Sequence, residues 1–302
     1  MMKETGCKIY PSDAKYVLIT PARNEAAFIE LTLASVIAQT VRPLKWIIVN
    51  DGSTDETEAI VQKYCAQHEW IELIQMPPRK ERDFAGKAHA FHAGYERLKS
   101  LQFAYIGSLD ADISFEPDYF SFLLKQLEGN PRLGLAGTPF KEGTEMYDYR
   151  FVSIEHVSGA CQLFRRKCFE EVGGYRPIEG GGIDHIAVLT ARMKGWQTRT
   201  FPEKYSHHHR PQGSAKRSPL KIRIHVGKLD YALGGHPLWE LCRVIYQMSK
   251  RPFIIGGLMI MVGYVSSMLQ FKDRSITPEL QSFRQREQLR RLKAFFINFV
   301  RV

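Results

Sequence analysis

The chain has 302 residues, of which 44% are apolar and 25% charged, a globular composition that leaves ample length for a packed core and excludes disordered, collagen-like and disulfide-scaffold chains. The formal net charge of +10 comes from the last third, because residues 204–302 hold 18 Lys and Arg against 5 Asp and Glu, whereas residues 1–203 hold 24 against 27. This distribution argues against a protein that coats nucleic acid and favours a local anionic partner such as lipid headgroups.

Short apolar runs alternate with segments of helical composition through the first half of the chain. Strands are predicted at 16–20, 46–49, 71–75 and 103–109, and helices at 25–39, 54–68 and 86–99. This order predicts an α/β fold with a mostly parallel sheet and helices on both faces. Because ligands bind such sheets at the carboxyl ends of the strands, the residues that follow each strand are the first site candidates.

Polar, acidic segments follow three of these strands: PARNE at 21–25, NDGSTD at 50–55 and DAD at 110–112. Carboxylates that meet at one edge repel one another unless a cation or sugar hydroxyls lie among them. Asp110 and Asp112 share a face of an extended segment, where two carboxylates suit Mn²⁺ or Mg²⁺ with a bound diphosphate. The alternative for this pair is an ordinary turn that caps a helix. No GxGxxG follows the first strand and the chain has no GxxxxGK[ST], which disfavours dehydrogenase and P-loop functions.

The segments around these motifs resemble the inverting glycosyltransferases of family 2, which have the GT-A fold: VLITPARNEAAFIELTLASVIAQT, WIIVNDGSTDET, AGKAHAFHAGYE and IGSLDADISFEPDYF. The resemblance runs from residue 16 to about residue 201. It implies that the first two loops hold the base and ribose of a nucleotide-diphosphate sugar through Pro21, Arg23, Glu25 and Asp51.

The same resemblance implies that Asp110 and Ala111 face the nucleotide and that Asp112 ligates the metal on the diphosphate. Lys87 lies in a Gly-Lys pair that the family places near the nucleotide, where a cation suits a diphosphate. The alternative for Lys87 is an exposed helix lysine.

An inverting transfer also needs a base that takes the proton of the acceptor hydroxyl. The family has a Gly-Glu-Asp motif followed by a helix that ends in Gly-aromatic, and this chain has Gly-Ile-Asp at 182–184 with Gly195-Trp196 after it. The resemblance therefore implies that Asp184 is the base, although Ile183 replaces the usual Glu. The alternative is that Asp184 only caps the helix, and Glu179 is the reserve candidate.

Two further segments are candidates for the sugar and the leaving group. Gly159 precedes an apolar strand and would let the hexose approach closely, or it belongs to a plain turn. Residues 207–217, HHHRPQGSAKR, are expected to form a mobile cationic loop whose Arg210 closes over the diphosphate, or a simple basic surface loop. Metal ligation by the three histidines is disfavoured, because adjacent side chains do not face one way. The QxxRW signature of processive synthases is absent, which favours transfer of a single sugar.

Residues 252–269 form an uncharged run that as a helix would be about 27 Å long, against a hydrocarbon core of ~30 Å. Basic residues flank both sides and the run contains Gly256, Gly257 and Gly263, so attachment to the membrane surface or a re-entrant hairpin is favoured over a span or a buried helix. We expect a GT-A catalytic domain over 1–215 and a helical, membrane-associating region over 216–302, at the cytoplasmic face of the membrane.

The sequence thus predicts an enzyme that moves a sugar, most commonly from a UDP-sugar in this family, to a lipid-linked or saccharide hydroxyl. The alternatives are a polyprenyl-phosphate glycosyltransferase, which needs no base, and a non-catalytic sugar-nucleotide-binding membrane scaffold. A nucleotidyltransferase is disfavoured, because no Gly-rich basic loop follows the first strand.

Residues 1–15 contain no apolar run, so no signal peptide is expected. The five cysteines follow no paired-ligand spacing and are expected to be reduced core thiols: Cys7, Cys65, Cys161, Cys168 and Cys242.

Overall fold

The computed structural model describes residues 15–78, 84–143, 145–146, 153–178, 180–210, 218–270 and 272–300, with the backbone alone at 84, 145, 146, 219 and 298–300. Cys7, Glu179 and the loop 211–217 lie outside the described residues. The chain divides into two compact units, residues 1–179 with 183–211 and residues 180–182 with 212–302.

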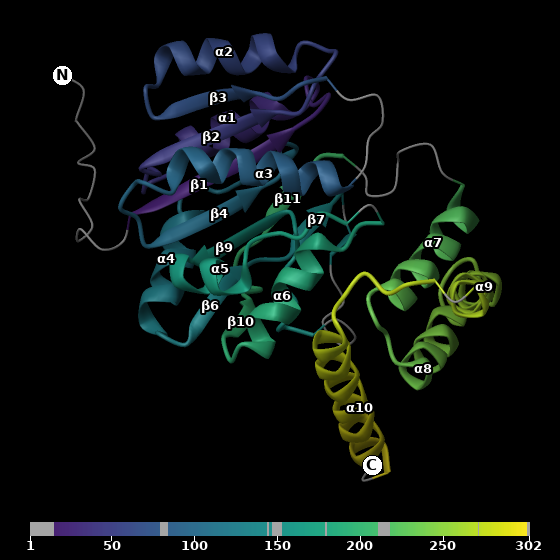
Figure 1. Cartoon of the computed structure of the whole chain (residues 1–302). Coiled ribbons are helices and arrows are strands. Elements are labelled where there is room, and N and C mark those ends of the chain that lie inside the picture. The colour runs from purple at the N-terminus through teal and green to yellow at the C-terminus, as the bar shows by residue number, and fades with distance from the viewer. Residues whose placement is uncertain are drawn as a thin grey trace. The chain divides into compact units, whose positions relative to one another are not determined.

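A seven-stranded sheet forms the centre of the first unit, in the order β10-β6-β9-β4-β1-β2-β3 (Figure 1). The strand bounds are β1 Tyr16–Ala22, β2 Lys45–Asn50, β3 Ile71–Gln75, β4 Tyr105–Leu109, β6 Leu133–Gly137, β9 Cys161–Arg165 and β10 Gln197–Thr200. Neighbouring strands are parallel except β9, which is antiparallel to β4 and β6. The predicted α/β fold with a mostly parallel sheet is confirmed, and the four predicted strands lie within two residues of their expected bounds.

Alternate side chains of β1 enter two different cores on the two faces of this sheet. Tyr16 and Leu18 join the core under α1, α2 and α4, whereas Val17 and Ile19 join the core under α3, α5 and α6. The helix bounds are α1 Ile29–Ile37, α2 Thr57–Gln67, α3 Phe84–Leu98, α4 Tyr119–Gly129, α5 Arg166–Val172 and α6 Ile183–Met193. Both faces are therefore covered, as the continuous apolar runs of the parallel strands require.

A second sheet of four short strands has the order β5-β11-β7-β8. Its strands are β5 Ile113–Phe115, β7 Phe140–Glu142, β8 Glu145–Met146 and β11 Ser206–His208. β11 pairs antiparallel with β5 and parallel with β7. The expectation of a mobile loop from residue 207 is therefore wrong for His207 and His208, because strands distant in sequence supply their hydrogen-bonding partners.

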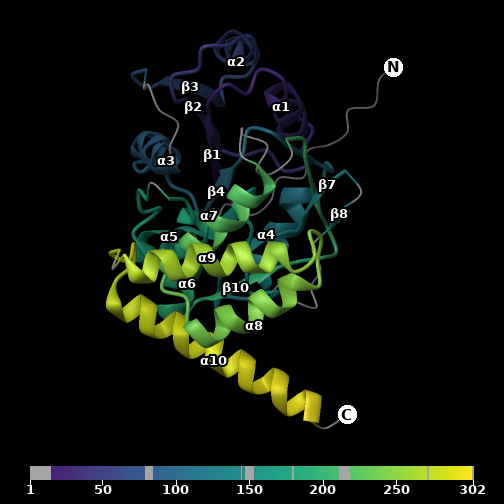
Figure 2. The same ribbon diagram turned by 90° about the vertical axis from the view of Figure 1, so that its right-hand side faces the viewer.

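Helices α7 Pro219–Ala232, α8 Pro237–Met248, α9 Ile255–Leu269 and α10 Pro278–Val300 make up the second unit. α9 packs against both α7 and α8 and lies between them in Figure 2. Ser218 caps α7 by accepting a hydrogen bond from the Lys221 N–H, and Pro219 and Pro237 occupy first-turn positions, where a missing N–H costs nothing. The helix expected from residue 252 begins only at Ile255.

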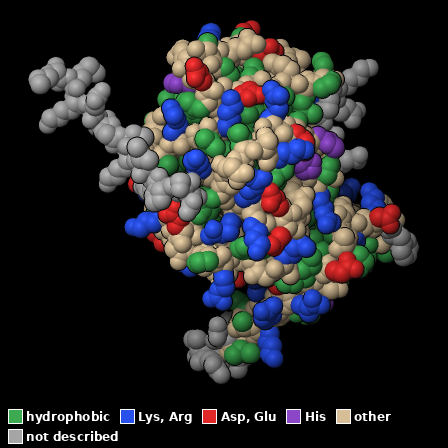
Figure 3. All heavy atoms as spheres, turned by 60° about the vertical axis from the view of Figure 1, so that its left-hand side comes forward, with side chains coloured by type: hydrophobic (Ala, Val, Ile, Leu, Met, Phe, Trp, Pro, Cys, Tyr) green, Lys and Arg blue, Asp and Glu red, His purple; other side chains and the backbone are tan. Residues whose placement is uncertain are grey.

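Among the described residues, no helix is both long and apolar enough to cross a membrane. Charged side chains of both signs are interspersed over the face of the molecule in Figure 3. The four described cysteines are free: Cys65, Cys161, Cys168 and Cys242. Burial raises the pKa of the thiols of Cys161 and Cys168 to about 12, so these two behave as core side chains.

Candidate functional site

The loops that follow β1 and β2 are joined by hydrogen bonds between the side chains of one and the backbone of the other. The Glu25 N–H donates to Thr57 Oγ1 at 2.8 Å, and the Ala26 N–H donates to Asp55 Oδ2 at 3.1 Å. In the other direction, the Thr54 N–H donates to Asn24 Oδ1 at 2.8 Å. The PARNE and NDGSTD motifs therefore form one fixed platform at the carboxyl end of the sheet.

Two ion pairs stand on this platform. Arg23 lies 4.0 Å from Asp51, whose carboxylate is buried. Glu25 accepts a 2.5 Å hydrogen bond from Arg210 Nη2, and the same guanidinium nitrogen donates to the Asn24 carbonyl at 3.0 Å. Arg210 Nε also lies 3.8 Å from Asp112 Oδ2. Arg210 thus links the loop after β1 to the DAD motif. Its partner Glu25 lies 185 residues earlier in the chain.

Asp110 follows β4 and forms an ion pair with Lys87, which projects from α3. Burial by itself would lower the pKa of Lys87, but Asp110, with Asp184 and Asp112, outweighs burial and raises that pKa. For Asp110, burial raises the pKa, Lys87 opposes this, and Asp112 adds to it. Lys87 is therefore a cation held among carboxylates, rather than a solvated helix lysine.

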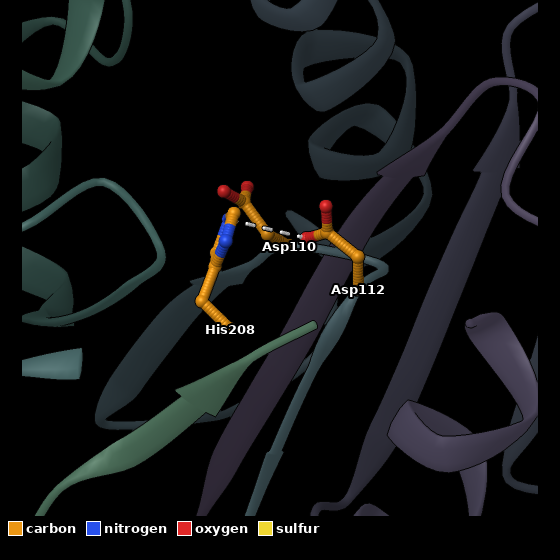
Figure 4. A group of neighbouring side chains, drawn as sticks. All are labelled: Asp110, Asp112 and His208. Atoms are coloured by element: carbon orange, nitrogen blue, oxygen red, sulfur yellow. Dashed lines mark ion pairs between the residues drawn. The ribbon is translucent and has the colours of Figure 1, made fainter. Parts of the chain in front are cut away.

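His208 completes a cluster with the two aspartates (Figure 4). One ligand atom from each of Asp110, Asp112 and His208 lies within 4.8 Å of the others. His208 Nε2 is 3.6 Å from Asp112 Oδ1, and its Nδ1 is 3.3 Å from Glu142 Oε1 on β7. This Nδ1 contact is an ion-pair distance without hydrogen-bond geometry. The imidazole therefore stands between the DAD motif on one side and a backing carboxylate on the other.

Sequence reasoning missed His208, because it disfavoured all three histidines as metal ligands. The strand period of β11 separates them: His207 is exposed and contacts Tyr205, whereas His208 turns toward Asp112. His209 then accepts or donates a 2.8 Å hydrogen bond with Ser114. If a strand had been expected through the three histidines, the alternation of its side chains would have singled out the middle one, His208, as facing a different side from its neighbours.

This donor set fits a divalent cation. Two carboxylates and one imidazole, with a third carboxylate behind the imidazole, provide oxygen and nitrogen ligands at one point. Mn²⁺ accepts such mixed ligands readily, whereas Mg²⁺ favours oxygen alone.

Asp184 lies in the first turn of α6, beside Gly159. A Cβ atom at Gly159 would lie 2.7 Å from Asp184 Oδ2, so only glycine leaves this carboxylate in its position. The Asp184 charge acts on Lys87, which places it in the electrostatic field of the aspartate cluster. Its location is compatible with both interpretations of the sequence, a base and an acidic residue at a helix N-terminus.

Two of the expected residues contribute little side-chain chemistry. Ala111 is 4% exposed and its methyl group belongs to the core, so that only its backbone can face a ligand. Pro21 is half-buried near the end of β1, in register with Val49 of β2.

Comparisons with known proteins identify the family and the fold. Residues 17–173 match the family model described as glycosyl transferase family 2. A poly-beta-1,6-N-acetyl-D-glucosamine synthase of Staphylococcus epidermidis is 25% identical over 170 residues, in a match that covers 50% of this chain and 39% of that protein. A 4,4'-diaponeurosporenoate glycosyltransferase of Staphylococcus aureus is 33% identical over 196 residues, in a match that covers 58% of this chain and 50% of that protein. The chain thus matches half or less of the length of these curated relatives.

Two solved structures share the fold. The mannosyltransferase PcManGT from Pyrobaculum calidifontis, in complex with GDP-Man and Mn²⁺, has a TM-score of 0.60 at 17% identity, covering 88% of this chain and 91% of that one. S. aureus TarS 1–349, in complex with UDP-GlcNAc, has a TM-score of 0.54 at 15% identity, covering 89% of this chain and 78% of that one. The family model covers more than half of this chain, and on that match the chain belongs to glycosyltransferase family 2.

Proposed function

We propose that this protein transfers a sugar from a nucleotide-diphosphate sugar to an acceptor hydroxyl, with inversion at the anomeric carbon. The observation that carries the proposal is the cluster of Asp110, Asp112 and His208, which lies between the cations Lys87 and Arg210. A nucleotide-diphosphate sugar needs both kinds of group, a divalent cation site for the diphosphate and fixed positive charges around it.

The platform after β1 and β2 provides the nucleoside side of the site. Its buried Asp51 and Glu25 supply acceptors for sugar hydroxyls and base N–H groups, and Arg23 and Arg210 hold these carboxylates in place. Asp110, Asp112 and His208 would hold a divalent ion, which neutralises charge on the leaving diphosphate when bound. Arg210 and Lys87 would add fixed cations where negative charge develops as the glycosidic bond breaks.

Asp184 is proposed as the base. It takes the proton of the acceptor hydroxyl as that oxygen bonds to the anomeric carbon, while the bond from this carbon to the diphosphate oxygen breaks. The electron pair of the broken bond leaves with the nucleoside diphosphate. Gly159 supports this role, because its missing side chain is what leaves Asp184 room beside it.

UDP-sugars are the donors we propose to try first, and lipid-linked and saccharide alcohols the acceptors. The relatives support a hexose donor: one is named as an N-acetylglucosamine polymer synthase, and the TarS structure holds UDP-GlcNAc. PcManGT was solved with GDP-Man, so GDP-sugars belong in the same panel.

Turnover of UDP-, GDP- and dTDP-sugars by the full chain with Mn²⁺ tests the proposal. We expect one donor to be hydrolysed or transferred, and Asp112→Asn and Asp184→Asn each to lower kcat at least about 100-fold. The matched control is Asp118→Asn, since this exposed aspartate is paired with Lys204 away from the cluster.

Three results would contradict parts of the proposal. Tight nucleotide binding without any turnover would indicate a non-catalytic binding protein. Turnover that survives Asp184→Asn would remove the base and favour a phosphate acceptor, which needs none. An equal decrease in kcat for Asp112→Asn and Asp118→Asn would show that the measured effect is not specific to the cluster.

A further inference from the structure

The helix α8 of the second unit turns its apolar side outward. Leu238, Leu241 and Ile245 recur at helical spacing on one stripe and are 48%, 46% and 59% exposed. The opposite side of α8 buries Glu240, which is 1% exposed, and Val244. A helix on a water-facing surface has the reverse pattern, with its polar residues outside.

The helix α9 also carries aliphatic side chains on its outer side. Ile255, Leu258 and Val262 are 50%, 45% and 49% exposed, whereas the glycines at 257 and 263 are buried together with the large side chains of Ile260 and Tyr264. A Cβ at Gly263 would overlap the carbonyl oxygen of a residue in α7, so the two backbones are in close contact. Glycines where two helices meet let their backbones approach closely, and the aliphatic side chains on the other side give the helix an apolar outer surface.

The two outward stripes lie on the same side of the unit. Gly257 of α9 lies against Val244 in the second half of α8, and the Tyr264 hydroxyl donates to the Gly235 carbonyl just before α8 begins, so the helices are antiparallel. At about 100° per residue, the α8 stripe is on average about a quarter of a turn from Val244, and the α9 stripe is somewhat more than a third of a turn from Gly257, in the same sense. In an antiparallel pair these rotations bring both stripes to one side.

The turn between the helices adds cations and apolar side chains at the same place. Lys250 and Arg251 are exposed, and Phe253 and Ile254 after them are 59% and 60% exposed. Ile254 has a φ of 60°, a conformation that a β-branched residue rarely adopts. Cations followed by apolar side chains fit the boundary between anionic headgroups and acyl chains.

We propose that the α8 stripe, the turn 250–254 and the α9 stripe form a membrane-binding surface that lies in the interface of an anionic lipid bilayer. α9 has 15 residues, about 22 Å of helix, which suits a position along the interface better than a span of ~30 Å. The charge favours lipid over a second copy of this chain. Residues 212–302 of the second unit carry 16 Lys and Arg against 5 Asp and Glu, so two copies of this basic unit would repel, whereas anionic headgroups would attract it.

Flotation of the full chain with vesicles tests this surface independently of any sugar transfer. We expect it to float with phosphatidylcholine vesicles that contain phosphatidylglycerol, and less with phosphatidylcholine alone. The double variant Phe253→Ser/Leu258→Ser should bind about tenfold more weakly or worse, because two apolar side chains no longer enter the bilayer. The control is Leu44→Ser, a similarly exposed leucine of the first unit, at 40%. All variants should keep the wild-type Tm, since each position is exposed.

Wild-type protein that stays unbound to the anionic vesicles overturns the proposal. So does a double variant that floats as well as the wild type. Light scattering provides a further test: a wild-type dimer that the double variant dissociates would assign this surface to a second copy of the chain.

Discussion

The imidazole of His208 lies between two carboxylates, one near each of its ring nitrogens. Nε2 lies near Asp112, and Nδ1 lies near Glu142, with the side chain only 9% exposed. Nε2 is thus the ring nitrogen that faces the aspartate cluster, and Glu142 lies on the opposite, Nδ1 side of the ring.

His208→Ala should weaken Mn²⁺ binding about 10- to 100-fold, since one ligand of the cluster is lost. Titration of the free Mn²⁺ signal by electron paramagnetic resonance measures this without any turnover. His207→Ala is the matched control, because the neighbouring histidine is exposed and faces away from the aspartates. Identical Mn²⁺ affinities in the two variants would exclude His208 from the cation site.

At the scale of elements, the contact of α7 with α9 depends on glycines. A Cβ at Gly227 would overlap the Ile260 carbonyl oxygen, and a Cβ at Gly263 would overlap the Ile224 carbonyl oxygen. These are backbone atoms, which cannot move aside as the end of a side chain can. The glycines therefore fix the distance between the helices rather than loosen them.

Two glycine substitutions in the same helix should have opposite effects on stability. Gly263→Ala should lower the free energy of unfolding of the second unit by about 2 kcal/mol or more, because α7 and α9 must separate. Gly256→Ala should be neutral or raise it by up to ~1 kcal/mol, since its Cβ would meet nothing closer than 3.6 Å and alanine favours the helix. Calorimetric unfolding of the full chain checks both, and a stable Gly263→Ala variant would refute the close contact.

On the largest scale, each unit is held together by long-range contacts of a different kind. The first unit has two apolar cores on the faces of one sheet. The second unit buries charges: Arg284 of α10 pairs with Asp230 of α7, and Arg243 of α8 lies 3.5 Å from the same carboxylate and 3.3 Å from Glu240. Burial and the neighbouring Asp230 raise the pKa of Glu240 to about 8, so one of the two carboxyl groups keeps its proton.

This buried carboxyl makes stability depend on pH. In the unfolded chain Glu240 titrates near ~4.3, so between about pH 4.3 and 8 the folded chain holds the additional proton. The free energy of unfolding should therefore fall as pH rises through this window and level off above about pH 8. Glu240→Gln should flatten that profile and be more stable than the wild type at pH 8.5 by up to about 5 kcal/mol, since each unit of pKa difference between the folded and unfolded chain corresponds to about 1.4 kcal/mol. Urea unfolding from pH 5 to 9 measures this, with exposed Glu279→Gln as the control that keeps the slope. A wild-type profile that is flat over this range would contradict the raised pKa.

Local patterns were sufficient for much of the first unit. The runs that became β1 to β4 and the helices between them were found within a few residues, because continuous apolar strands and helical spacing are properties of neighbouring residues. The strands of the second sheet were not predicted, since β11 has only three residues and depends on β5 and β7 for its hydrogen bonds. The start of α9 was placed three residues too early, because hydropathy does not distinguish a turn of apolar residues from a helix.

By itself, the sequence determined the family, the α/β fold and the edge of the sheet that carries the acidic motifs, because each of these follows from short segments of chain. Only the tertiary structure decided which side chains meet there. His208 joins Asp112 across 96 residues and Arg210 joins Glu25 across 185, and no local pattern specifies such pairs. The same holds for the second unit: its apolar run was evident, but whether those side chains turn inward or outward depended on how closely the glycines let α7 approach α9.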